Sequence, residues 1–323
     1  MLPSLIDIER AAELVHGAMA PSPQLHWPLL SARVGAEVWV KHENHNPTGA
    51  FKVRGGLIYL ARLRAERPEA SGIIAATRGN HGQSLAFAAQ RLGLRAVIVV
   101  PHGNSVEKNA AMRAYGAELI EHGHDFQAAL EEARRLAESE RLHFVPSFDR
   151  PLIEGVATYA LEMFRALPDL DTVYVPIGLG SGICGVIAAR NALGLATRVV
   201  GVVAENAPAY ALSFQAKRAV STNSAATFAD GVACRIPVDA AVDEIGRGAD
   251  RVVRVSEAAI ADAMRHYYTD THNIAEGAAA TPLAAALLDP PERRGRKLGL
   301  VLSGGNIDRP LYARVLAGET PKV

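Results

Sequence analysis

Short apolar runs alternate with longer amphipathic segments along most of this chain. The segments between the runs, such as residues 124–141, repeat apolar residues at helical spacing with charged residues opposite them. The runs themselves are rich in β-branched residues, as buried strands are. They are 72–77, 95–100, 117–120, 172–177, 197–204 and 297–302. Strands that alternate with helices predict an α/β fold, in which helices cover parallel sheets.

The length of the chain, 323 residues, suits two α/β domains, although a single large sheet is an alternative. We expect a small domain over residues 72–147, which contains three strand-and-helix steps. Residues 1–71 and 148–323 would then form the large domain.

Composition excludes several classes of partner. Lysine plus arginine equals aspartate plus glutamate, at 34 each, so no overall charge favours binding to nucleic acid or to a membrane surface.

The longest uncharged run, 172–189, contains a proline and several glycines, and we interpret it as strand, turn and helix. Charged residues near the N-terminus exclude an export signal there. Cys184 and Cys234 are too few and too distant to suggest disulfides or zinc, which favours the cytoplasm.

Ligands of open α/β folds bind beyond the carboxyl ends of the strands, which directs attention to three loops. The first loop, TRGNHGQS, begins at Thr77 and leads into an apolar helix. Asn80 is predicted to cap this helix, and Gly79 and Gly82 would allow a ligand to approach the backbone. Taken alone, the motif fits an ordinary strand-to-helix turn equally well.

The second loop, PIGLGSGICG at 176–185, follows a strand and opens a helix at about Gly182. Backbone N–H groups at such a helix start hold a phosphate group well. The glycines also resemble a dinucleotide fingerprint loosely, and Glu205 lies near the acidic position of that motif. A dinucleotide ligand therefore stays open at this point.

The third loop, VLSGGNID at 301–308, places Ser303 at the end of the last strand. In a separate stretch, NPTGAFKVRGG at 46–56, Lys52 lies among small residues and glycines. A lysine amine, a phosphate site and polar groups for a ring together suggest pyridoxal phosphate, whose aldehyde condenses with an amine.

These four motifs, in this order, resemble those of the serine/threonine dehydratase group of fold-type II pyridoxal-phosphate enzymes, relatives of serine racemase and threonine synthase. The resemblance extends from about residue 20 to residue 310. It implies two domains, each with a mostly parallel twisted sheet flanked by helices, and a homodimer.

The resemblance also implies roles for individual residues. Lys52 corresponds to the Schiff-base lysine, with Phe51 packed beside the cofactor ring. Asn80 would face the ring hydroxyl and Ser303 the ring nitrogen. The phosphate loop would consist of Gly178, Leu179, Gly180, Ser181 and Gly182. The segment that receives the substrate carboxylate would consist of Thr77, Arg78, Gly79, Asn80 and His81. Leu179 and Ser181 depart from the family's usual run of glycines.

The chemistry of these groups favours elimination. A free lysine, with a pKa of about 10.4, is almost wholly protonated at pH 7, whereas Lys52 displaced from the cofactor would leave as a neutral base. A serine at the ring nitrogen cannot hold that nitrogen protonated by charge, which weakens the ring as an electron sink. We therefore expect an ammonia-lyase of class EC 4.3.1. It would convert a β-hydroxy amino acid, such as L-threonine or L-serine, into a 2-oxo acid and ammonia.

Two departures from the family pattern bear on the substrate and on metal binding. Arg78 stands where serine racemases carry a serine base; a guanidinium cannot take that role, so we expect little racemisation. Arg78 either favours a second carboxylate, as in L-threo-3-hydroxyaspartate, or points outward. Metal-activated relatives pair a residue like Glu205 with a second carboxylate, but Ala211 stands there, so we expect no tight metal site.

Three other functions stay open on the sequence alone. A β-elimination or β-replacement enzyme or a racemase of the same fold would keep Lys52 and the phosphate loop. A nucleotide-binding dehydrogenase would leave Lys52 unexplained. A cofactor-free binding protein would bind no pyridoxal phosphate.

Overall fold

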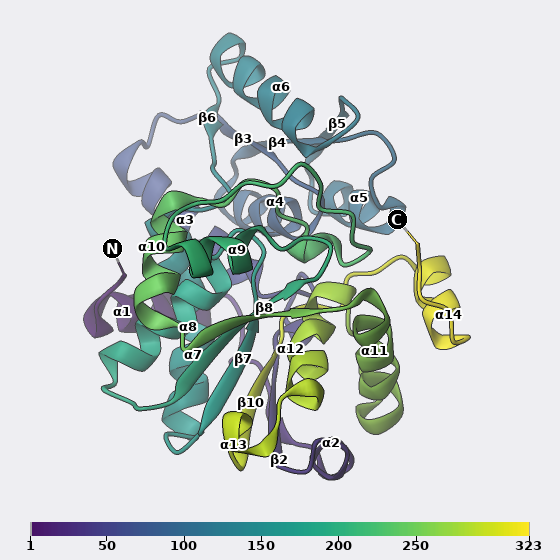
Figure 1. Cartoon of the computed structure of the whole chain (residues 1–323). Coiled ribbons are helices and arrows are strands. Elements are labelled where there is room, and N and C mark those ends of the chain that lie inside the picture. Colours follow the sequence, from purple (N-terminus) through teal and green to yellow (C-terminus); the bar gives the residue numbers. More distant parts are fainter. Residues whose placement is uncertain (1, 323) are drawn as a thin grey trace.

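The computed structural model describes residues 2–322 and contains two separate β-sheets (Figure 1). The larger sheet has six strands in the order β1-β2-β10-β7-β8-β9, and all neighbours are parallel except β1 and β2. Its strands are β1 (Gln24–His26), β2 (Glu37–His42), β7 (Thr172–Pro176), β8 (Arg198–Ala204), β9 (Arg251–Val255) and β10 (Lys297–Leu302).

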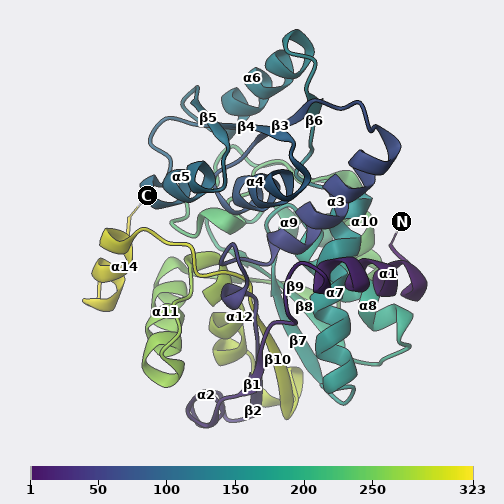
Figure 2. The ribbon, with the colours of Figure 1, turned by 180° about the vertical axis from the view of Figure 1, so that it is seen from behind.

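Helices cover both faces of the larger sheet (Figures 1 and 2). Side chains alternate between the faces: Val173 and Val175 of β7 pack into one core, and Tyr174 packs into the other. The first core is closed by α1 (Leu5–His16), α7 (Arg150–Ala166), α8 (Ser181–Ala192), α9 (Ala209–Ala216) and α10 (Asp239–Gly248). The second is closed by α2 (Pro28–Val34), α11 (Glu257–Thr271), α12 (Gly277–Leu288) and α14 (Arg309–Leu316). The short α13 (Pro291–Arg294) precedes β10.

The smaller sheet has four parallel strands in the order β5-β4-β3-β6. On one face Ile73 and Ile98 pack against α3, α4 and α5, and on the other Ile74 and Val97 pack against α6. The strands are β3 (Gly72–Ala76), β4 (Arg95–Val100), β5 (Glu118–Glu121) and β6 (His143–Phe144). The helices are α3 (Lys52–Glu66), α4 (Asn80–Leu92), α5 (Val106–Ala114) and α6 (Phe126–Ser139).

The α/β fold with two mostly parallel sheets, predicted from the sequence, is confirmed, and the alternative of a single large sheet is wrong. Each of the six predicted strands is present with ends within one residue of the prediction, and the helix predicted over 124–141 is α6. The strands β1, β2, β6 and β9 were not predicted. The strands of the smaller sheet all lie within 72–147, but α3 also packs on that sheet, so the domain boundaries stay a prediction.

The parallel arrangement brings several loops to one edge of the larger sheet. Strands β2, β10 and β7 are neighbours, so the segments that follow them begin side by side. The segment after β2 passes through the 3-10 turn η1 (Glu43–His45) before α3 begins. A second 3-10 turn, η2 (Asp230–Val232), lies between α9 and α10. No helix within residues 2–322 is long and apolar enough to cross a membrane.

Candidate active site

Lys52 lies where the predicted loops meet. Helix α3 begins at Lys52 itself. Its main chain is held by two bonds: the Phe51 N–H donates to the Ser303 carbonyl (2.9 Å), and the Ser84 hydroxyl donates to the Lys52 carbonyl (2.6 Å). Its amine donates to the Ser181 hydroxyl at 3.1 Å. The structure therefore brings the lysine, the phosphate loop and the Ser303 turn together.

The surroundings of the Lys52 amine favour its neutral form. The residue is half-buried, and loss of water around it lowers the pKa of the amine to about 8. No carboxylate within residues 2–322 forms an ion pair with it to offset this burial. The Phe51 ring lies 5.3 Å from Nζ and meets the Tyr159 ring edge to face. A lysine with such a pKa supplies a base more readily than one in water does.

The loop after β7 has the backbone geometry of an anion cradle. Gly180 caps α8 with a positive φ of 102°, and α8 begins at Ser181, one residue before the predicted start. The first backbone bond of α8 runs from Cys184 N to Gly180 O. The N–H groups of residues 181–183 are therefore left without helical acceptors, as phosphate binding requires.

Close packing fixes the shape of this cradle. A Cβ atom on Gly178 would lie 2.4 Å from the Gly231 carbonyl oxygen, and one on Gly180 would lie 2.7 Å from the Ala241 Cβ. The Leu179 carbonyl accepts a bond from the Tyr210 hydroxyl at 2.8 Å. Only glycine fits at positions 178 and 180, and Tyr210 holds the main chain at position 179.

The prediction that Asn80 caps α4 is wrong. Gly79 is the capping residue, and the Thr77 hydroxyl accepts from the Gly79 N–H at 2.9 Å. Asn80 is the first helical residue, and its side chain turns away to donate to Glu276 (2.7 Å) and to accept from Asn306 (2.9 Å). Hydrogen bonds to two residues that are distant in sequence take the place of the helix cap predicted from the sequence.

The other residues of the segment predicted to bind the substrate carboxylate differ in how far they are buried. Thr77 and His81 are buried. Burial and, to a lesser degree, the nearby Lys52 together lower the pKa of His81 to about 3, so its ring is neutral. Its Nε2 atom has no hydrogen-bond partner within residues 2–322. Arg78 is exposed and forms no hydrogen bond or ion pair with any residue that the structure describes.

Ser303 lies at the carboxyl end of β10, as expected, and is buried. Its carbonyl is bonded to Phe51, while its hydroxyl has no partner among residues 2–322. The Glu276 carboxylate lies beside the same turn, because a Cβ atom on Gly304 would come within 2.7 Å of its Oε1. The free hydroxyl suits a ring nitrogen that either donates or accepts.

A buried chain of charges, which no sequence motif described above indicates, lies near Asn80. Burial raises the pKa of Glu276, and Lys108, 3.4 Å away, opposes that rise. The Lys108 ammonium also donates to Asp230 at 2.6 Å. Helix patterns alone give no sign that Lys108 of α5 reaches residues more than a hundred positions away.

The predicted absence of a metal site stays a prediction. Glu205 is exposed at the end of β8, and Ala211 is buried in α9. Within residues 2–322, no three histidine, cysteine, aspartate or glutamate side chains are grouped so that they could hold a metal ion.

The residues present fit pyridoxal phosphate. The cofactor requires an amine for its aldehyde, donors for its phosphate and polar partners for its ring. Lys52, the N–H groups of residues 181–183 and the unpartnered Ser303 hydroxyl supply these groups at one place.

Comparison with known proteins identifies the protein family. The family described as "Pyridoxal-phosphate dependent enzyme" matches residues 15–304. An L-threonine ammonia-lyase of Thermotoga maritima is 35% identical over 314 residues, which cover 97% of this chain and 78% of the relative. An L-threo-3-hydroxyaspartate ammonia-lyase of Saccharomyces cerevisiae is 30% identical over 320 residues, covering 99% and 98% of the two chains.

Solved structures agree as well. The structure of maize serine racemase superposes with a TM-score of 0.91 and 26% identity over 98% of both chains. The cofactor and the fold predicted from the motifs are thereby confirmed. The chain belongs to the family of pyridoxal-phosphate-dependent enzymes, within the fold-type II group of serine and threonine dehydratases.

Proposed function

We propose that this enzyme removes the hydroxyl and amino groups of a β-hydroxy amino acid, L-threonine or L-serine, and releases a 2-oxo acid and ammonia. The observation that carries the proposal is Lys52, an amine with a pKa near 8 and no carboxylate partner among residues 2–322. Similarity to threonine ammonia-lyases over nearly the whole chain supports the same activity. Pyridoxal phosphate, when bound, supplies the electron sink that makes the Cα proton of the substrate acidic.

Lys52 would take up that proton in the proposed reaction. Its main chain is bonded on both sides, which fixes the amine in one place while it exchanges partners. Ser303, as a neutral hydroxyl at the proposed ring-nitrogen position, would keep the electron sink weak. Expulsion of the β-hydroxyl is then favoured over transamination.

The substrate carboxylate would bind at the start of α4. The first helical bond there runs from Gln83 N to Gly79 O, so the N–H groups of Asn80 and His81 have no backbone acceptor. His81 is neutral and adds no charge there, and its buried Nε2 is available as a further hydrogen-bond partner for the substrate. Helix N-termini of this kind favour anions.

Product formation tests the proposal. The purified protein, supplied with pyridoxal phosphate, should form equal amounts of 2-oxo acid and ammonia from L-threonine and L-serine. Lys52→Ala should abolish this turnover and the covalent attachment of the cofactor. Turnover by the wild type only in the presence of an added nucleophile would instead identify a β-replacement enzyme.

L-threo-3-hydroxyaspartate is a second candidate substrate. Arg78 is exposed and has no partner within residues 2–322, so its guanidinium is free to meet a second carboxylate. A hydroxyaspartate ammonia-lyase is also among the relatives. If Arg78 binds that carboxylate, Arg78→Ala should lower kcat/KM for hydroxyaspartate much more than for threonine or serine. An equal loss for all three would leave Arg78 without a role in specificity.

Little racemisation is expected of this enzyme, because Arg78 occupies the position of the second base in serine racemases. Recovery of D-amino acid, with solvent deuterium at Cα, would overturn this expectation.

We also propose a cytoplasmic homodimer that binds no nucleic acid. The two free, buried cysteines and the balanced charge support the location and the partners, and the family resemblance supports the dimer. Sedimentation of the purified protein tests the oligomeric state.

A further inference from the structure

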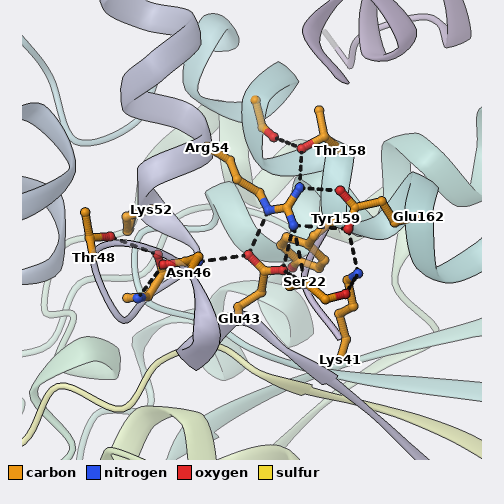
Figure 3. A network of polar contacts seen from close by, with 12 residues as sticks. Ser22, Lys41, Glu43, Asn46, Thr48, Lys52, Arg54, Thr158, Tyr159 and Glu162 are labelled. Atoms are coloured by element: carbon orange, nitrogen blue, oxygen red, sulfur yellow. Dashed lines mark hydrogen bonds and ion pairs between the residues drawn. The ribbon is translucent and has the colours of Figure 1, made fainter. Parts of the chain in front are cut away.

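A buried cluster of charged side chains lies beneath the start of α3, outside the active site (Figure 3). We call it the Arg54 cluster. Arg54 and Glu43, at its centre, are both completely buried. Its members are Ser22, Lys41, Glu43, Arg54, Thr158 and Glu162.

The cluster balances two cations against two carboxylates. Arg54 binds Glu43 through two parallel bonds, Nε to Oε2 at 2.8 Å and Nη2 to Oε1 at 3.0 Å. It binds Glu162 at 2.6 Å, and Lys41 binds the other oxygen of Glu162 at 2.6 Å. Burial alone would raise the pKa of Glu162, but Arg54 and Lys41 outweigh it and lower that pKa to about 2. The Glu162 carboxylate is therefore charged at neutral pH.

Glu43 also connects to the loop that precedes Lys52. The Asn46 side-chain N–H donates to Glu43 Oε2 at 3.3 Å, and the Asn46 side-chain oxygen Oδ1 accepts from the Ala50 N–H at 3.1 Å. One carboxylate is thus linked to position 50 through Asn46 and to position 54 through Arg54. Lys52 lies midway in sequence between these two attachment points, and Figure 3 shows it beside Asn46 and Arg54.

Helix packing leaves α3 little freedom to move on this support. A Cβ atom on Gly155 of α7 would lie 2.2 Å from the Arg54 carbonyl oxygen, so the two backbones are in direct contact. Thr158, one turn along α7, accepts from Arg54 Nη1 at 2.9 Å and donates to the Gly155 carbonyl at 2.7 Å.

We propose that Glu43 is a positioning residue for Lys52. Glu43 holds the main chain on both sides of Lys52, so that the amine stays in place when it changes from binding the cofactor to accepting the substrate proton. Buried ion pairs often stabilise a protein no more than apolar packing of the same volume, but they fix geometry. A misplacement of about 1 Å can cost roughly a hundredfold in rate. The inference depends on the proposed role of Lys52.

Two forms of the cofactor separate positioning from general stability. Pyridoxal phosphate can attach to Lys52, whereas pyridoxine phosphate lacks the aldehyde and binds through the phosphate loop and the ring partners alone. The ratio of their dissociation constants therefore measures how well the amine is placed. Glu43→Gln, which keeps the side chain's size and removes its charge, should lower the wild-type preference for pyridoxal phosphate about tenfold. It should lower kcat more than it changes KM.

Asn46→Ala provides a second test, because it cuts the link to Ala50 and leaves every ion pair of the cluster intact. Asn46→Ala should shift the ratio of the two dissociation constants in the same direction as Glu43→Gln. If Glu43→Gln does not fold, Asn46→Ala alone tests the inference. The matched control is Asp270→Asn in α11, which weakens the partly buried ion pair between Asp270 and Arg33 of α2, remote from Lys52 along the chain. It should lower Tm and leave the ratio unchanged.

One outcome would overturn the inference: an unchanged ratio of the two dissociation constants in Glu43→Gln and Asn46→Ala, whether or not affinity for both cofactor forms falls equally. A wild type that binds both forms equally would instead contradict the proposed role of Lys52 itself, on which the positioning depends.

Discussion

Lys52 shows how one residue's surroundings set its chemistry. Protein atoms replace water around its amine, and the nearest polar partner described is the neutral Ser181 hydroxyl at 3.1 Å. Burial without a counter-charge favours the uncharged form of a lysine. The same amine can therefore attack an aldehyde and later accept a proton near neutral pH.

The rate at which pyridoxal phosphate attaches to the cofactor-free protein should follow the neutral fraction of Lys52. With a pKa of about 8, the rate should rise about tenfold per pH unit below pH 7 and level off above about pH 9. Mixing experiments between pH 6 and 10, followed by the visible absorbance of the bound cofactor, measure this profile. A rate still rising at pH 10 would mean that Lys52 titrates like a lysine in water.

Motif residues were predictable from the sequence, but their partners were not. The positions of Lys52, Ser303 and the phosphate loop follow from strand ends and glycine patterns. The capping role given to Asn80 failed because its amide bonds to Glu276 and Asn306, which lie about two hundred positions away. Contacts at such separations leave no local pattern in the chain.

At the scale of elements, uniformly apolar strands were recognised and mixed ones were not. Five of the six predicted strands are nearly continuous apolar runs that are buried on both faces, and β5 is partly exposed. β2 reads EVWVKH and β9 reads RVVRV, with charges at their ends and within them, and β1 and β6 are only three and two residues long. The sheet neighbours that stabilise such strands come from distant parts of the sequence.

The phosphate loop is an element whose glycines are required by packing. Gly178→Ala would place its Cβ 2.4 Å from the Gly231 carbonyl oxygen, which belongs to the backbone and cannot swing aside. We expect the affinity for pyridoxal phosphate to fall at least about tenfold and stability to fall by about 1–3 kcal/mol. Titration of the cofactor-free protein and urea unfolding measure the two effects.

Gly246→Ala is the matched control for this substitution. Gly246 lies within α10, and a Cβ atom there would meet open space. The change should stabilise the protein by about 0.5–1 kcal/mol and leave cofactor affinity unaltered. Equal affinities in the two variants would contradict the packing argument for Gly178.

At the scale of the whole molecule, a few polar contacts join the two sheets. Helix α5, which packs on the smaller sheet, contributes Lys108 to Asp230 and Glu276, both of which belong to elements around the larger sheet. Ser105, which caps α5, also donates to Asp308 before α14 at 2.5 Å. The charge of Glu276 is therefore linked to the way in which the two parts of the molecule meet.

Lys108→Met should destabilise the protein by about 3 kcal/mol at pH 7, because it leaves the Glu276 carboxylate buried without its cation. In the folded protein the pKa of Glu276 is already raised above 4.5. The stability that this raised pKa contributes is therefore fully present below pH 4.5 and is lost as the pH rises through the pKa of the folded state. Removing Lys108 raises that pKa further. The cost of the substitution should accordingly be smaller at pH 5, where Glu276 can hold its proton, than at pH 7.

Urea unfolding of four proteins at both pH values tests this coupling: wild type, Lys108→Met, Glu276→Gln and the double variant. In the double variant the neutral amide no longer requires a cation, so most of the stability lost at pH 7 should return. The Asp230 side chain is 29% exposed and can be solvated without Lys108, so it should contribute little to the cost. A cost that is equal at both pH values and is not recovered in the double variant would show that Lys108 stabilises the contact between the sheets through packing, independently of Glu276.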